Sequence, residues 1–340
     1  MLSAEQVKQA ARDAGFDLCG IAAATRHPKL ARLASWIADG HAGEMHYLAD
    51  SLDERLDPMV FLPTARSVIS LGVVYNTPHP YSTEVAGRDG RVAVARYAWG
   101  DDYHDVLRTR IRALLVWMAE AAGPGLEALS CVDDGPVQER VFAEQAGLGW
   151  IGKNTCLINP RLGSWVFLAA IVTNADLLPD APAVDQCGSC TRCLDACPTQ
   201  AIVEPYRIDA TKCLSYVTIE QRGDLDASMA GAIRDQVYGC DICQDVCPWN
   251  RRAATSDDPA WQPRESLLFP RLVELCERPD EEWRKLLANS AMRRAGLRRL
   301  RRSLAHASSH LPDAEAERAR TAMREQPSRD FPEVARALEP

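Results

Sequence analysis

Eight of the chain's twelve cysteines fall between Cys187 and Cys247. The first four have the spacing Cys-x2-Cys-x2-Cys-x3-Cys-Pro, which ends at Pro198. A short loop with a cysteine at every third residue can place three thiolates on one 4Fe–4S cube, and the fourth, before the proline, reaches a different cube. The spacing therefore predicts iron–sulfur chemistry, in which electrons pass through the protein.

A second, incomplete copy of this run extends from Cys240 to Pro248, with Val237 where its first cysteine would stand. Cys213 lies upstream and can supply the missing thiolate. In two-cluster proteins the fourth cysteine of each run binds the other cube. The predicted ligands are Cys187, Cys190, Cys193 and Cys247 for the first cluster and Cys197, Cys213, Cys240 and Cys243 for the second.

Paired zinc sites and disulfides are the alternatives for so many cysteines. Zinc sites use two separated Cys-x2-Cys pairs, and disulfide frameworks are typical of small secreted proteins. This chain has 340 residues, and its N-terminus lacks the pattern of a secretory signal, so we expect a cytoplasmic protein with two clusters. Four isolated cysteines are expected to be small buried apolar side chains: Cys19, Cys131, Cys156 and Cys276.

Two adjacent carboxylates, Asp133 and Asp134, follow a predicted strand at residues 127–132 and precede Gly135, Pro136 and a predicted helix. Groups at the end of a strand can reach an active site and act as acids or bases. Asp134 is equally well placed to cap the helix that follows. The sequence leaves both interpretations open.

Two short motifs point to nucleotides or cobalamin, and both are incomplete. Residues 147–152 read Gly-x-Gly-x-x-Gly, but they follow a predicted helix at 137–146, whereas a dinucleotide fingerprint follows a strand. Asp102-Tyr103-His104 begins the lower-ligand motif of one cobalamin-binding fold, and the glycine expected three residues later is Leu107. Neither motif is therefore assigned.

The elements around these residues predict an α+β protein with three parts: 1–178, 179–252 and 253–340. Residues 178–182, rich in Pro and Asp, mark the first linker. Residues 280–309 are expected to be helical and carry six arginines between 293 and 302. Apolar periodicity predicts helices at 7–14, 30–37 and 104–122 and strands at 18–24, 67–75, 127–132 and 165–173.

The composition fits a folded, water-soluble protein, with 46% hydrophobic and 25% charged residues. The formal net charge of -8 at pH 7 argues against a protein that coats nucleic acid without specificity, although a local basic surface is compatible with it. No run approaches the roughly 18 apolar residues that cross a bilayer. We expect no membrane partner.

Several segments together resemble the epoxyqueuosine reductase family, in unbroken order over residues 1–250. The resemblance implies an N-terminal α/β cobalamin-binding domain, a ferredoxin-like domain with two 4Fe–4S clusters and a short helical, HEAT-like C-terminal region. The matching segments are residues 54–58, 96–104, 132–137, 149–154, 213–216, 218–223 and 238–243 and both cysteine runs.

The resemblance implies reduction of epoxyqueuosine to queuosine at the wobble position of tRNA. Electrons from the clusters would reduce cob(II)alamin to cob(I)alamin, which attacks an epoxide carbon, although a radical route has the same stoichiometry. An acid must protonate the departing oxygen, and the family's proton donor maps to Asp134. Burial beside the corrin would raise the pKa of Asp134.

The resemblance also implies binding residues and partners. The partners are the tRNA anticodon stem-loop and an unidentified electron donor, and we expect a monomer. The alternatives are a corrinoid reductive dehalogenase acting on a small molecule and a non-catalytic ferredoxin-type carrier. The implied cobalamin contacts are Arg55, Tyr97, Asp134, Asn154, Ser215 and Asp241, and the implied tRNA contacts are Arg222, Arg293, Arg294, Arg298 and Arg301.

Overall fold

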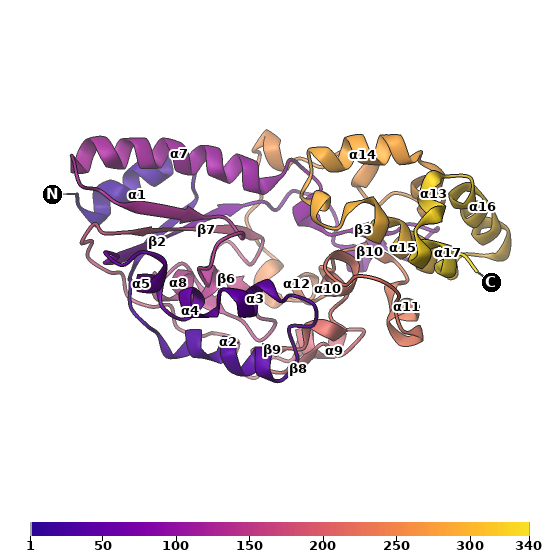
Figure 1. Ribbon diagram of the computed structural model, residues 1–340, viewed down its shortest axis with the longest axis horizontal. Coiled ribbons are helices and arrows are strands. Elements are labelled where there is room, and N and C mark those ends of the chain that lie inside the picture. The colour runs from indigo at the N-terminus through magenta and orange to yellow at the C-terminus, as the bar shows by residue number, and fades with distance from the viewer. Residues whose placement is uncertain (1, 340) are drawn as a thin grey trace.

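The computed structural model describes residues 2–339 and is elongated, with the chain termini at opposite ends (Figure 1). The N-terminal unit occupies one end and the C-terminal helices the other, and the cysteine-rich segment lies between them. Among the described residues, no helix combines the length and the apolar character that a bilayer span requires.

A four-stranded sheet in the order β1-β2-β7-β4 is the centre of the N-terminal unit. Every pairing in it is antiparallel, so the alternating helices and strands build an α+β layout and not a parallel sheet. The central strand β2 is buried along its whole length because helices cover both faces of the sheet. The strands are β1 (Leu18–Ala23), β2 (Ser67–Val74), β4 (Ala128–Cys131) and β7 (Val166–Thr173).

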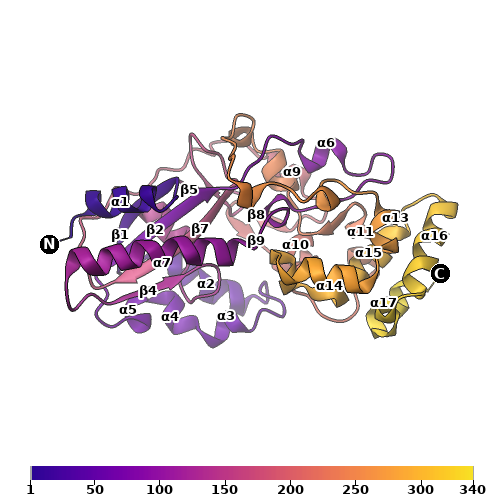
Figure 2. The same cartoon turned by 90° about the horizontal axis from the view of Figure 1, so that it is seen from above.

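Helices α1 (Ala4–Asp13) and α7 (Tyr103–Ala122) lie on one face of this sheet (Figure 2), and α8 (Glu139–Gln145) lies on the other (Figure 1). Side chains of β2 alternate between the two cores, with Ile69 facing α7 and Val68 facing α8. The remaining elements are α2 (Pro28–Ala38), α3 (Tyr47–Asp50), α4 (Leu52–Leu56), α5 (Pro58–Phe61), α6 (Ser82–Val85), β3 (Ala93–Val94), β5 (Trp150–Ile151) and β6 (Leu157–Ile158).

In the cysteine-rich segment two short helices, α9 (Arg192–Ala196) and α12 (Ile242–Asp245), each end just before a Cys-Pro pair and pack against each other. β10 pairs in parallel with β3, which ties the segment to the N-terminal unit. The other elements are β8 (Ile202–Glu204), β9 (Arg207–Ile208), α10 (Leu214–Ile219), α11 (Ala227–Ile233) and β10 (Gln236–Tyr238).

The C-terminal helices pack around α15, which also contacts α10, α11 and β10. One hydrophobic core joins Leu214 and Val237 to Leu300, so it continues across residue 252, and the predicted domain limits stay predictions. Residues 280–309 are largely helical, as expected, but a 3-10 turn at 291–294 and Gly296, at φ +66°, divide them into two helices. The helices are α13 (Leu272–Glu277), α14 (Asp280–Ala288), α15 (Gly296–Ser308), α16 (Asp313–Arg324) and α17 (Pro332–Ala337).

Candidate active site

The cysteines of the first predicted set are neighbours in the structure. Burial raises the pKa of the Cys193 thiol to about 11, and Cys247 and Cys187 raise it further. Burial likewise raises the pKa of Cys247, with additional effects from Cys187 and Cys190. We call Cys187, Cys190, Cys193 and Cys247 cysteine group one. Its loop is exposed on both sides of Cys187 and Cys190.

Cysteine group two consists of Cys197, Cys213, Cys240 and Cys243, all of which are partly buried. Burial raises the pKa of Cys213, and Cys197 adds to this effect. The pKa of Cys240 is raised strongly by burial and further by Cys213 and Cys197. Thiols that stay protonated until they meet iron release their protons when a cluster binds.

The two groups have the same members as the two ligand sets predicted from spacing. The members of each group are recognised as neighbours because they affect one another's pKa. Within residues 2–339 no three His, Cys, Asp or Glu side chains are arranged as ligands of a single metal ion. All twelve cysteines are free thiols, which leaves every member of both groups available to iron. Their role as cluster ligands remains a prediction.

Cys156, expected to be an isolated apolar side chain, instead lies against group two. Its thiol hydrogen bond with Cys243 lowers its own pKa and is the main cause of the raised pKa of Cys243. The adjoining Asn154, which is 3% exposed, donates from Nδ2 to the Cys243 carbonyl over 3.3 Å. The loop after β5 therefore packs directly on the cysteine-rich segment.

The acid loop, residues 132–136, turns its two aspartates to different partners. Asp133 adopts φ +60° and accepts a 2.7 Å hydrogen bond from the phenol of Tyr103 at Oδ2. Asp134 accepts a 2.5 Å bond from Arg108 Nη2 and a 3.0 Å bond from the Val132 amide. Both carboxylates are exposed, so their partners distinguish them.

The rise in the pKa of Asp134 that is expected beside a corrin stays a prediction, and in the protein alone the pKa is lowered. Burial alone would raise it, but the hydrogen bonds from Arg108 and from the Val132 amide outweigh burial and lower the pKa of Asp134. Behind the loop, Glu139 Oε1 accepts the Asp133 amide at 2.8 Å. Burial and the neighbouring Asp133 raise the pKa of Glu139 well above its usual range, and Glu139 supports the backbone of Asp133.

The tyrosine cluster, Tyr97, Tyr103 and Tyr238, joins the acid loop to the interior. Tyr97 donates to the phenol oxygen of Tyr238 over 3.0 Å, and Tyr238 donates to the Ala291 carbonyl. The rings of Tyr97 and Tyr103 meet edge to face with centroids 6.1 Å apart. Burial raises the pKa of all three phenols, so they stay neutral hydrogen-bond groups.

The other implied cobalamin contacts surround these features. The Arg96 amide donates to Asp241 Oδ2 over 2.6 Å, which places Asp241 beside Tyr97. Burial and Asp245 raise the pKa of Asp241 to about 7. Ser215 lies in the first turn of α10, directly after Cys213. Arg55 lies on α4, and its carbonyl accepts from Gln138 Nε2, just beyond the acid loop.

The implied tRNA contact at Arg301 is wrong, because Arg301 is buried. Its side chain is 0% exposed and pairs with Asp280 at 2.8 Å, and it also donates to the carbonyls of Cys276 and Arg278. A guanidinium enclosed in this way cannot reach a phosphate. The side chains of Arg293, Arg294 and Arg298 are 45–58% exposed, and Arg222 is exposed.

Replacing Arg301 by methionine should destabilise the protein by about 3–5 kcal/mol, because Asp280 stays buried without its counter-charge. Chemical denaturation measures this loss. Arg271→Met, which removes the exposed pair with Glu315, is the matched control and should cost about 1 kcal/mol or less. Equal, small losses in both variants would contradict a structural role for Arg301.

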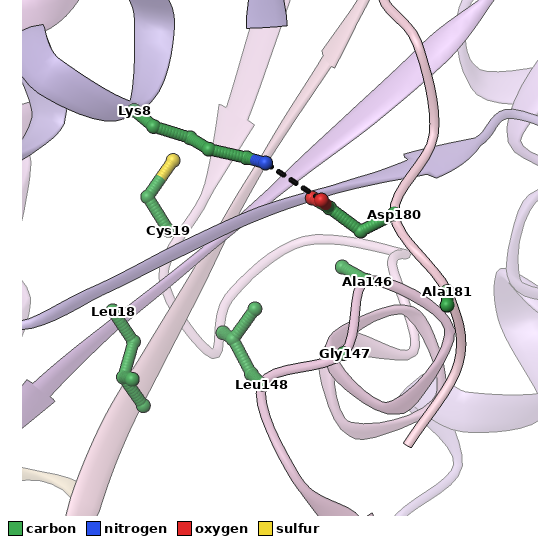
Figure 3. A pocket seen from close by; sticks show the side chains of 8 residues that line it. All are labelled: Lys8, Leu18, Cys19, Ala146, Gly147, Leu148, Asp180 and Ala181. Carbon is green, nitrogen blue, oxygen red and sulfur yellow. Dashed lines mark hydrogen bonds and ion pairs between the residues drawn. The ribbon is translucent and has the colours of Figure 1, made fainter. Parts of the chain in front are cut away.

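The glycine-rich stretch 147–152 borders a small cavity away from these groups. It follows α8 and leads into β5, so the strand–turn–helix context of a nucleotide fingerprint is missing. The cavity, of about 280 Å³, contains a 2.6 Å ion pair between Lys8 and Asp180 with Cys19 beside it (Figure 3). Gly147, at φ +75°, is one of the residues that line the cavity.

Comparison with known proteins decides the family. The chain is 46% identical to an epoxyqueuosine reductase of Synechocystis over 80% of its length and 92% of the relative's. It is 40% identical to that of Xanthomonas campestris over 92% of its length and 88% of the relative's. The chain belongs to the epoxyqueuosine reductase family.

Family models and solved structures agree with this assignment. A model described as epoxyqueuosine reductase QueG, DUF1730 matches residues 55–134, and one described as a 4Fe-4S double cluster binding domain matches residues 186–250. An epoxyqueuosine reductase crystallised with an epoxyqueuosine-modified tRNA stem loop has a TM-score of 0.86 and 30% identity, over 98% of this chain and 88% of that one.

A Bacillus subtilis epoxyqueuosine reductase has a TM-score of 0.85 and 30% identity, with the same coverage of both chains. Its catalytic aspartate loop is swung out of the active site. The sequence alone pointed to no chemical role for Tyr103, Glu139 and Cys156. Tyr103 lies in the segment 96–104 that carries the family resemblance, which was the available signal, whereas no local pattern pointed to Glu139 or Cys156.

Proposed function

We propose that this chain reduces epoxyqueuosine to queuosine at the wobble position of tRNA. The observation that carries the proposal is the meeting of the acid loop, the tyrosine cluster and cysteine group two in a chain that matches 92% of the length of an epoxyqueuosine reductase. Removal of the epoxide oxygen needs two electrons and two protons. Cysteine group two would deliver the electrons, and the acid loop with the tyrosine cluster would deliver protons.

Cysteine groups one and two are proposed to bind one 4Fe–4S cluster each. The support is their composition, since each group offers four thiols and a cube needs four. The loop that carries Cys187 and Cys190 is exposed, whereas the residues on either side of Cys240 are buried, so electrons from an external donor would enter at group one. We further propose that the protein is a monomer and acts in the cytoplasm, because thiols stay reduced there.

Cobalamin fits the residues between group two and the acid loop. A corrin carries peripheral amides that both donate and accept hydrogen bonds, and Asn154, Asp241 and Tyr97 offer amide, carboxyl and phenol groups there. His104 is held by Asp102 at 2.7 Å, in agreement with a corrin that has no protein imidazole. When bound, cobalamin would supply a strongly reducing cobalt that attacks carbon.

The proton donor is one of the two aspartates of the acid loop. Sequence alone favours Asp134, but the geometry supports Asp133, since Asp133 is bound to the tyrosine cluster while Asp134 is paired with Arg108. A donor must hold a proton next to the departing oxygen. We therefore propose Asp133 as the donor. Asp134 could donate the proton only if the acid loop changed conformation, and the catalytic loop of the Bacillus subtilis relative is swung out of its active site.

The decisive experiment is anaerobic incubation of the reconstituted holoprotein with cobalamin, a reductant and tRNA that contains epoxyqueuosine. Nucleoside mass spectrometry should show loss of one oxygen atom and appearance of queuosine. Reactions without cobalamin and without reductant are the controls. Unchanged epoxyqueuosine in the complete reaction would reject the proposed function.

The arginines Arg222, Arg293, Arg294 and Arg298 are proposed to contact tRNA phosphates. Affinity for the stem-loop should fall as salt rises, because phosphate contacts release bound cations. Arg293→Gln and Arg294→Gln should each reduce the slope of log affinity against log salt by about 0.7–0.9. Fluorescence anisotropy at several salt concentrations measures this slope. An unchanged slope in both variants would remove these two residues from the interface.

A further inference from the structure

An exposed tyrosine and an arginine from distant parts of the sequence meet beside the acid loop. Tyr47 begins α3 and is 41% exposed. Arg294 ends the 3-10 turn 291–294, and its guanidinium carbon lies 5.3 Å from the centre of the Tyr47 ring. Arg294 also pairs with Glu220, which follows α10. Parts of all three units of the chain therefore meet at this ring.

Asp133 is within electrostatic reach of this pair. Burial and Glu220 raise the pKa of the Tyr47 phenol, and the Asp133 carboxylate raises it further. Asp133 also helps to raise the pKa of Arg294, in which the hydrogen bond with Glu220 overcomes burial. The turn that carries Arg294 also contacts the tyrosine cluster, because the Ala291 carbonyl accepts a hydrogen bond from Tyr238. Tyr47 is therefore joined through this turn to the cluster that binds Asp133, on the side where a nucleotide flanking the reacting one would lie.

Positive charge gathers on the same side. Burial lowers the pKa of Arg299, Glu220 and Glu44 oppose this fall, and Arg222 and Arg294 add to it. Three guanidinium groups therefore share two carboxylates. The Arg299 Nε is buried without a hydrogen-bond partner, and its Nη2 donates to the Arg294 carbonyl over 2.6 Å. Guanidinium groups that repel one another are stabilised by an anion between them, and RNA phosphates are such anions.

We propose that Tyr47 is a positioning residue for the RNA, and that its ring stacks on the base of a nucleotide next to the epoxide-bearing one. When RNA binds, Arg294 leaves the Tyr47 ring and pairs with a backbone phosphate, so that the face of the ring becomes available for stacking. An exposed cation–π contact is weak, and the phosphate also replaces Glu220 as the partner of Arg294. Single-stranded RNA loops are commonly bound by stacking on aromatic side chains. The inference rests on the proposed function and adds the contact that orients its substrate.

The test uses holoprotein variants Tyr47→Leu and Tyr47→Phe with epoxyqueuosine stem-loops that carry 2-aminopurine on the 5′ or the 3′ side of the modified nucleotide. Loss of one stacked base should raise KM about tenfold to a hundredfold in Tyr47→Leu. We expect kcat to change little and the quenching of 2-aminopurine by the wild type to disappear. Tyr47→Phe keeps the ring and should retain both KM and quenching.

Two results would overturn the inference: wild-type KM and quenching in Tyr47→Leu, or a loss confined to kcat, which would place Tyr47 in the chemistry. Iron content equal to wild type confirms that the exposed substitution leaves the fold intact. These outcomes are distinct from failure of the proposed function, because in that case the wild-type protein itself leaves the stem-loop unreduced.

Discussion

Asp133→Asn should lower kcat about 10²–10⁴-fold, the range by which general acid catalysis accelerates a reaction. Asparagine has nearly the same shape and keeps a carbonyl that accepts the Tyr103 hydrogen bond, but it cannot give a proton to the departing oxygen. Single-turnover reduction of a modified stem-loop, followed by nucleoside mass spectrometry, measures the rate.

Asp134→Asn is the matched variant, since it makes the same chemical change one residue away. It removes an exposed pair with Arg108, in which the two side chains are 49% and 40% exposed. Such pairs contribute about 0–1 kcal/mol, so kcat should stay within about fivefold of wild type. A fall in kcat that occurs in Asp134→Asn and not in Asp133→Asn would identify Asp134 as the donor. It would also show that the acid loop changes conformation before proton transfer.

Cys197→Ser should abolish turnover and leave about four of about eight irons in the anaerobically reconstituted protein. The lost cluster should be that of group two, although Cys197 belongs to the first cysteine run, because its neighbours in the structure are Cys213 and Cys240. Iron and sulfide analysis, with electron paramagnetic resonance of the reduced protein, measures the outcome.

Double variants identify the group to which Cys197 belongs. Cys197→Ser combined with Cys240→Ser should lose no more iron than either single variant, since both residues serve one cluster. Cys197→Ser combined with Cys193→Ser should lose nearly all iron. The opposite pattern would disprove the crossed arrangement. Cys156→Ser is the control, because Cys156 contacts Cys243 outside both ligand sets and its variant should retain about eight irons.

The cysteine chemistry and most regular elements followed from local sequence. Spacing over a few residues determines which thiols one cube can reach, and the apolar period of residues 104–122 predicted α7 (Tyr103–Ala122) almost residue for residue. The β-branched segment at residues 67–75 predicted a buried strand, and β2 is buried along its whole length.

The choice between neighbouring residues of the same type depended on tertiary contacts. Asp133 and Asp134 have the same side chain, but the φ of +60° at Asp133 turns it towards Tyr103 while Asp134 meets Arg108. Arg294 and Arg301 lie in one arginine-rich stretch, yet Arg301 is enclosed by partners on α13 and α14.

The sequence by itself determined the family, the chemistry of the cysteines and the regular elements, because spacing and periodicity act between residues a few positions apart. The tertiary structure alone decided which acid faces the tyrosines, which arginines are exposed and that Cys156 lies against group two. The physical reason is that burial and charge pairing arise between segments distant in sequence: Tyr47 and Arg294 meet only because the chain folds back on itself.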